Sequence, residues 1–159
     1  MIKPLFCLML MTLTTACSAE SAKQQTNKPP QTQENTMNQT ESPQTASVSV
    51  NGQTFTLTLE NNPTAHAFAQ MLPLDLTMSD HLNNEKYAAL PKPLPANDQP
   101  AGQIHRGDVM LYQGDTLVLF YKSFASNYRY TKIGKIENAD RLKQLLGKET
   151  VHVKWQTLK

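Results

Sequence analysis

Two apolar runs in the second half of the chain constrain the fold more than any other stretch. Residues 107–112 and 116–121 are rich in Val, Leu, Tyr and Phe, and Gln113, Gly114 and Asp115 separate them. β-Branched and aromatic residues favour strands, and a short polar segment with a glycine favours a hairpin turn. The runs therefore predict a largely buried β-hairpin, to which residues 128–136 add a third strand.

The segment before this hairpin predicts a second hairpin and a helix. Apolar and polar side chains alternate at residues 48–50 and 55–59, on either side of Asn51-Gly52, a pair that favours a type I′ turn. Asn62 and Pro63 have the types expected of an N-cap and a first helical residue. Apolar residues recur at helical spacing as far as position 72, which predicts a short amphipathic helix.

The remaining elements are short and mostly extended. Residues 74–78 alternate as a strand, whereas residues 79–100, with four prolines, hold only short extended pieces and loops. Asn138 and Gly147 have the types expected at the start and end of a second helix, and residues 150–155 alternate as a last strand. This order favours a mainly antiparallel barrel or compact sandwich, because closing the sheet hides its edges.

The N-terminus has the pattern of an export signal. Lys3 gives it a positive start, and residues 5–13 form an apolar run too short to cross a hydrocarbon core of about 30 Å. Small residues then lead to Cys17, in an order that resembles the lipobox of bacterial lipoproteins, in which the cysteine is acylated. We therefore predict that residues 1–17 are a lipoprotein signal peptide ending at a lipidated Cys17, with ordinary cleavage next to Ala16 or Ala19 as the alternative.

This resemblance implies a membrane partner and a location. A lipid-anchored chain would reside in the bacterial cell envelope, facing the periplasm or the cell surface, and Ser18 resembles the residue that sends lipoproteins on to the outer membrane. Residues 18–46 are rich in Gln, Thr, Asn, Ser, Glu and Pro, which bury too little apolar surface to order the backbone. We expect a disordered linker there and one folded domain at residues 47–159.

Charge and cysteine content limit the functions of this domain. The net charge is only +2 and the arginines are dispersed, which argues against a nucleic-acid partner. The cysteines, Cys7 and Cys17, leave residues 47–159 with neither a disulfide nor a thiolate nucleophile. The four histidines never fall at His-x-His or His-x-x-x-His spacing, and the glycines form no phosphate loop, so we expect no metal site and no cofactor.

Several motifs of the domain occur in an order that resembles a known family. After the first helix these are Leu72-Pro73-Leu74-Asp75-Leu76-Thr77-Met78, Glu85-Lys86-Tyr87, Leu90-Pro91, Gly107-Asp108-Val109, Leu111-Tyr112, Leu117-Val118-Leu119-Phe120-Tyr121, Ile133-Gly134-Lys135-Ile136 and Leu146-Gly147. Together they resemble the bacterial cyclophilin-like domain family over nearly all of residues 53–155. The resemblance implies a closed, eight-stranded antiparallel β-barrel with two short helices over its ends, in a family whose activity is mostly undefined.

Cyclophilins themselves are peptidyl-prolyl isomerases that present an arginine from a Phe-x-Arg stretch to the X–Pro amide. The nearest counterpart here is residues 103–108, where Arg106 precedes Gly107-Asp108 but no Phe lies two places ahead. No catalytic residue is therefore carried over. Arg106 stays a candidate for a functional cation, with an exposed, solvated side chain as the alternative.

Aromatic residues after the central hairpin form the candidate ligand site. These residues are Phe120, Phe124, Tyr128 and Tyr130. Their flat apolar faces suit a peptide or small ligand, and core packing is the alternative for Phe120. Asp80 and His81 are interpreted as turn or loop residues, and residues 85–87 as a solvated helical turn or the rim of the groove.

These observations favour an envelope-anchored lipoprotein whose cyclophilin-like domain binds a peptide or small ligand without catalysis. The missing isomerase residues are the reason for this interpretation. Two alternatives stay open: a peptidyl-prolyl isomerase or folding chaperone of exported proteins, and an accessory subunit of an envelope complex.

Overall fold

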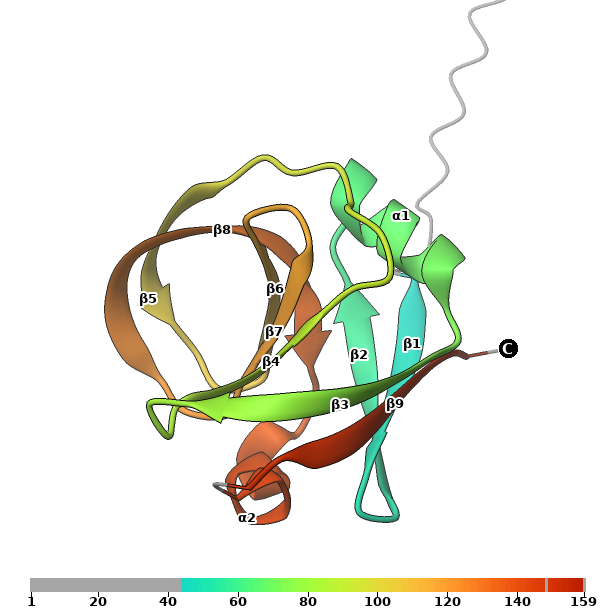
Figure 1. Cartoon of the computed structure of the whole chain (residues 1–159), viewed down its shortest axis with the longest axis vertical. Coiled ribbons are helices and arrows are strands. Elements are labelled where there is room, and N and C mark those ends of the chain that lie inside the picture. The colour runs from blue at the N-terminus through green and yellow to red at the C-terminus, as the bar shows by residue number, and fades with distance from the viewer. Residues whose placement is uncertain (1–43, 148, 159) are drawn as a thin grey trace, which may run out of the picture. The chain divides into compact units, whose positions relative to one another are not determined.

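The computed structural model describes residues 44–147 and 149–158 and shows a β-barrel with a helix over each end (Figure 1). The strands are β1 (Thr45–Val50), β2 (Gln53–Leu59), β3 (Leu74–His81), β4 (Glu85–Ala89), β5 (Gln99–Ile104), β6 (Asp108–Tyr112), β7 (Thr116–Phe120), β8 (Phe124–Ile136) and β9 (Val151–Thr157). The helices are α1 (Pro63–Met71), a 3-10 turn η1 (Ala139–Arg141) and α2 (Leu142–Leu146).

The barrel closes because eight of the nine strands form a ring. Their order is β2-β1-β9-β3-β4-β7-β6-β8, and β8 pairs back to β2. At this seam Leu59 pairs with Gly134, and a Cβ atom on Gly134 would lie 2.4 Å from the Thr58 carbonyl oxygen. Only glycine allows so close a backbone approach. The predicted closed antiparallel barrel with two short helices is confirmed.

Local sequence signals lie where they were predicted. Asn51 and Gly52 have φ angles of 48° and 76°, as a type I′ turn between β1 and β2 requires. The Asn62 side chain caps α1 by accepting a hydrogen bond of 2.8 Å from the backbone N–H of the third helical residue. Inside the barrel, Phe68 of α1 packs edge-on against Trp155 of β9, with ring centroids 5.8 Å apart.

Two expectations for polar segments are wrong, and one of the two alternatives for residues 85–87 is excluded. The Asn138 side chain makes no capping hydrogen bond to the described backbone, because its own backbone is left-handed and η1 comes before α2. Residues 85–87 belong to strand β4 and form no helical turn, and Asp80 and His81 end strand β3 and do not lie in a loop. Residues 85–87 are extended because β4 pairs with β3 on one side and with β7 on the other.

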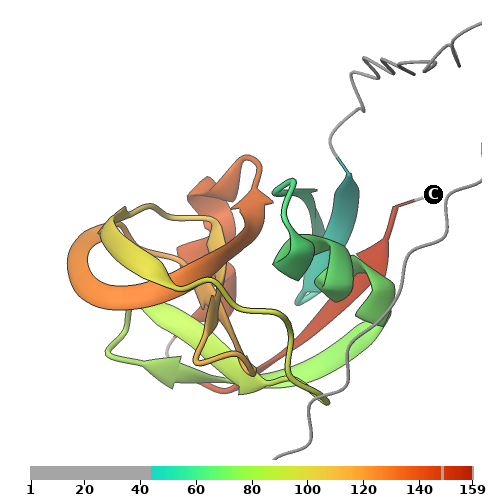
Figure 2. The same ribbon diagram turned by 90° about the horizontal axis from the view of Figure 1, so that it is seen from above.

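Strand β8 is bent, and its first half leaves the barrel wall. It carries an extra residue, Ile133, where its pairing with β6 shifts between Val109 and Met110. A second irregularity lies where β8 pairs with β5, between Pro100 and Gly102. Such bulges bend a strand and increase its twist. In Figures 1 and 2, β5 and the first half of β8 stand out as an arm beside β6 and β7.

The predicted signal peptide and its Cys17 lie outside the described residues, as does most of the predicted linker. The described part begins just before Thr45, the first residue of β1. Across this part of the chain, no helix combines the length and the apolar character that a membrane span requires.

Candidate functional site

The site lies on the outer side of the wall formed by β4, β7 and β6. Successive residues of a strand face opposite sides, so Lys86 and its partner Leu119 face the barrel interior, whereas the paired residues Glu85 and Phe120 face outward. The arm of β5 and β8 covers part of this outer face. A second apolar cluster forms between arm and wall, from Ile104, Met110, Val118, Phe120 and Tyr130.

A pocket of about 450 Å³ opens beside this second cluster. Strands β3, β4, β6, β7 and β8 all contribute to it, so its lining is assembled from distant parts of the chain. The lining residues are His81, Leu82, Glu85, Tyr87, Tyr112, Gln113, Thr116, Val118, Tyr128 and Tyr130. Four of these are tyrosines, which present a large apolar ring face and a polar tip. We call this the tyrosine pocket.

The tyrosine rings form contacts around the pocket. The ring centroid of Tyr112 lies 6.3 Å from that of Tyr128 and 5.5 Å from that of Tyr130. The Tyr87 ring packs edge-on against His81, with centroids 6.1 Å apart. Tyr128 is 64% exposed whereas Tyr130 is buried, so the rings extend from solvent to the bottom of the pocket. Burial and the nearby Glu85 carboxylate raise the pKa of Tyr130 to about 12, which keeps its hydroxyl protonated.

Glu85 is the acidic group of the tyrosine pocket, and it is only 9% exposed. Burial raises its pKa to about 7, and the negative charge of Asp80 adds to the shift. Among the described residues, no group donates a hydrogen bond to its carboxylate. The group therefore changes charge near neutral pH inside an aromatic pocket.

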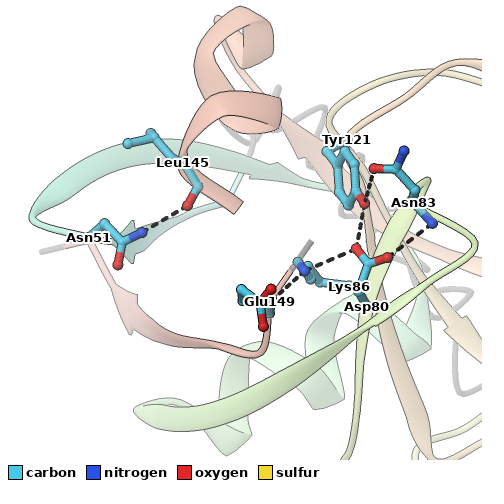
Figure 3. Close-up of polar contacts among 7 residues, drawn as sticks. All are labelled: Asn51, Asp80, Asn83, Lys86, Tyr121, Leu145 and Glu149. Carbon is cyan, nitrogen blue, oxygen red and sulfur yellow. Dashed lines mark hydrogen bonds and ion pairs between the residues drawn. The ribbon is translucent and has the colours of Figure 1, made fainter. Parts of the chain in front are cut away.

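Lys86, the next residue of β4, lies in a separate polar network inside the barrel (Figure 3). Its ammonium group is 0% exposed and donates hydrogen bonds of 3.0 Å to the Asp80 carboxylate and 2.6 Å to the Glu149 carbonyl oxygen. The Tyr121 hydroxyl and the Asn83 backbone N–H also donate to Asp80. Burial raises the pKa of Asp80, but hydrogen bonds from Tyr121 and Lys86 outweigh it, so the net pKa is lowered. The network thus holds an ionised Asp80 and ties β3 and β4 to the segment before β9.

The residues predicted for ligand binding come together, but they play two different parts. Tyr128 and Tyr130 line the tyrosine pocket. Phe120 is buried beneath it, with its ring centroid 5.5 Å from Tyr130 and 5.9 Å from Phe124. The two phenylalanines therefore pack behind the lining, and the two tyrosines are the ones that line the pocket.

Arg106, the candidate cation, does not line the tyrosine pocket. It lies in a separate depression with Lys135 and Asp140, and its guanidinium group, 43% exposed, forms an ion pair with the Asp140 carboxylate. Its backbone N–H donates a hydrogen bond of 2.9 Å to the Ser123 hydroxyl. These contacts fit a role in holding η1 near the turn before β6.

A second cavity, of about 380 Å³, lies on another side of Tyr130. It is formed between the start of α1 and residues 95–101. In it, Thr64 donates a hydrogen bond of 2.6 Å to the Pro95 carbonyl oxygen, and Thr131 donates one of 2.6 Å to the Asp98 carboxylate. Both threonine hydroxyls are therefore engaged in hydrogen bonds, whereas Glu85 in the tyrosine pocket is not.

The sequence predicts no site role for Tyr112. The alternation of β6 places Tyr112 on the same side as Met110, but no local signal indicates that this outer side is partly covered by an arm. The alternative that residues 85–87 form a rim fits Glu85 and Tyr87, which line the pocket, but not Lys86, which faces the barrel interior. Among the described residues, no three His, Cys, Asp or Glu side chains lie together as a metal site would require.

Comparison with known proteins relates the chain to one family and two structures. The sequence model of the Cyclophilin-like family matches residues 48–156. No curated protein matches the chain. A hypothetical protein of Archaeoglobus fulgidus, solved in solution, is similar with a TM-score of 0.50 and 20% identity, over 73% of this chain and 95% of that one. McbB, solved in complex with tryptophan, is similar with a TM-score of 0.51 and 13% identity, over 70% of this chain and 44% of McbB. At these identities the structural similarity concerns the fold alone.

Proposed function

Because the chain belongs to the cyclophilin-like family over residues 48–156, we propose that its domain is a binding module that takes a peptide segment or small ligand into the tyrosine pocket. The observation that carries this proposal is the set of four tyrosines around a pocket of about 450 Å³. Pockets of about 300–1,000 Å³ with mainly apolar walls and a few polar groups are the usual sites for small ligands.

The chemistry of the pocket supports binding of a partly apolar group. Tyrosines provide a large contact area at a small loss of side-chain entropy, since each has few rotatable bonds. Tyr128 and Tyr87 are both exposed at the pocket, so a ligand can reach them without movement of the backbone. Tryptophan, the molecule solved with McbB, is an example of an aromatic ligand that such walls would accept.

Prolyl isomerisation stays the alternative prediction from the family resemblance. It requires an oriented donor that weakens the X–Pro amide resonance beside an apolar slot. The pairing of Arg106 with Asp140, away from the tyrosine pocket, supports binding without catalysis. The other alternative, an accessory subunit of an envelope complex, would use the same pocket to hold a segment of its partner.

The binding proposal is tested by titrating the full chain with a set of N-acetylated, C-amidated tripeptides, which carry no terminal charge. We expect the NMR signals of Tyr112 and Tyr128 to shift on binding of peptides with a central aromatic residue. Tyr128→Ala should weaken binding by about tenfold, as loss of a central aromatic contact does. Leu158→Ala removes an exposed apolar side chain outside the pocket and serves as the matched control. Shifts confined to other surfaces, or none at all, would reject these peptides as ligands of the pocket.

We also propose that the domain is held at the bacterial cell envelope by acylation of Cys17, with a membrane as its anchoring partner. Cys17→Ser should abolish incorporation of a labelled fatty acid and move the protein from the membrane fraction to the soluble fraction. Cys7→Ser, which changes a cysteine inside the apolar run, should leave both properties unchanged. Continued labelling of the Cys17→Ser variant would show that the anchor lies elsewhere.

A further inference from the structure

The tyrosine pocket holds a carboxyl group without a positive partner. Glu85 is 9% exposed, and no lysine or arginine is among the residues that line the pocket. Lys86 follows it directly in sequence, but its ammonium group lies on the other face of β4, engaged with Asp80 and Glu149. A buried carboxylate without a partner is costly, and a cation supplied from outside the chain would remove this cost.

The walls around Glu85 have the electronic character that attracts a cation. Aromatic rings carry negative charge on their faces, and a cation within about 6 Å of a ring centroid is stabilised, most strongly when it is partly desolvated. On one part of the lining the Tyr112 ring packs against both Tyr128 and Tyr130, with centroid distances of 6.3 and 5.5 Å. Tyr87 lies on β4, two residues from Glu85 and on the same strand face.

Other classes of ligand fit this lining less well. An anion would face the Glu85 carboxyl and four electron-rich rings, with no lysine or arginine among the lining residues to neutralise it. A purely apolar ligand would cover Glu85 without giving it a partner, and would thereby increase the desolvation cost. A weakly hydrated organic cation satisfies both the carboxylate and the ring faces.

We propose that the ligand of the tyrosine pocket carries an organic ammonium group, which rests against the tyrosine rings with its charge toward Glu85. This inference rests on the proposed binding function and specifies the chemical class of the ligand. The volume of about 450 Å³ accommodates an alkylated ammonium head together with a short attached chain. The group could belong to a small molecule or to a side chain of a peptide, which share this chemistry.

A dependence on pH follows from the position of Glu85. Its pKa of about 7 in the free protein means that a bound cation would favour the ionised form and release a proton. Affinity for the cation should therefore rise between about pH 6 and pH 8.

Other titratable groups surround Glu85. They are His81 and Asp80 on β3, Tyr87 on its own strand, Tyr112 on β6, Tyr121 after β7, and Tyr128 and Tyr130 on β8. His81 lines the same pocket, so His81→Gln is required as a separate variant.

The experiment titrates the full chain with choline and with butylammonium, each against a neutral molecule of similar shape, dimethylbutanol and butanol. NMR shifts of the pocket tyrosines report binding. We expect each cation to bind at least about tenfold more tightly than its neutral counterpart at pH 8. Glu85→Gln should remove this preference and its pH dependence, whereas His81→Gln should keep both. Circular dichroism verifies that each variant is folded.

The possible outcomes separate this inference from the function on which it rests. Equal binding of cations and neutral molecules, or a preference unchanged in Glu85→Gln, would overturn the ammonium assignment. If only the uncharged tripeptides bind, the pocket is a binding site but the inference is wrong. If neither cations nor tripeptides bind, the proposed function fails as well.

Discussion

Replacing Lys86 with alanine is expected to lower the free energy of unfolding by about 3–5 kcal/mol, the cost of breaking a buried ion pair from one side. The Lys86 ammonium group is 0% exposed, and its removal leaves the Asp80 carboxylate without its cation and the Glu149 carbonyl oxygen without that donor. Alanine also leaves a cavity where the lysine side chain packed. Urea unfolding at pH 7 measures the loss.

Two further variants separate the contributions to this loss. Lys86→Met keeps most of the side-chain volume, so it should lose less stability than Lys86→Ala while still leaving Asp80 without its cation. Lys154→Ala, on the exposed side of β9, should change stability by no more than about 0.5 kcal/mol. A loss below about 1 kcal/mol in Lys86→Ala would mean that the network of Figure 3 adds little to the stability of the barrel.

The second large effect concerns Glu85 and pH. Its pKa is about 7 in the folded chain against an ordinary value of 4.5, so the folded state holds the proton more tightly than the unfolded state. The stability that this proton provides is complete below about pH 4.5 and is lost as the pH rises through 7. The loss corresponds to about 3 kcal/mol, at about 1.4 kcal/mol per pKa unit.

Glu85→Gln is the variant that tests this, because glutamine keeps the shape and stays neutral at every pH. Relative to the unaltered protein, it should gain about 3 kcal/mol in unfolding free energy between pH 4.5 and pH 8. Both proteins carry the same histidines, so the contribution of these residues to the unfolding free energy cancels in the comparison. Measurements stay above pH 4.5 because Asp80, whose pKa is lowered, loses its stabilising effect as the pH falls further. Parallel pH profiles of the two proteins would contradict the assignment.

The pH profile and the ligand experiment address the same carboxyl group in different states. The stability profile concerns the empty pocket, in which Glu85 has no partner among the described residues. The ammonium titration asks whether an added cation supplies that partner. If both results are as expected, the ionised Glu85 carboxylate lowers the stability of the ligand-free chain, and a bound cation neutralises its charge. Binding sites commonly reduce stability in this way.

Short-range patterns were sufficient for most of the secondary structure. Asn51-Gly52 specifies its turn because few other residue pairs tolerate two positive φ angles, and Asn62-Pro63 specifies a helix start by capping and by a fixed φ. These signals act within a few residues and do not depend on the rest of the fold. Asn138 shows the limit, because the same residue type there adopts a left-handed backbone and does not cap.

The site could be predicted only in part, because its geometry depends on strand pairing. Tyr128 and Tyr130 could be grouped by alternation within one strand. Their meeting with Tyr112 depends on the bulges that bend β8 over the outer wall. Glu85 and Lys86 are adjacent and both charged, and no local pattern states which of them faces the core.

The sequence alone predicts the hairpins, the first helix and the alternating strands. Through the order of its motifs, it also predicts the closed barrel of the cyclophilin-like family. These follow because turns, caps and alternation are properties of neighbouring residues. Only the tertiary structure decided that Lys86 is enclosed with Asp80 while Glu85 enters the tyrosine pocket. The physical reason is that burial and charge pairing are set by residues that lie far apart in the chain and meet only when the barrel closes.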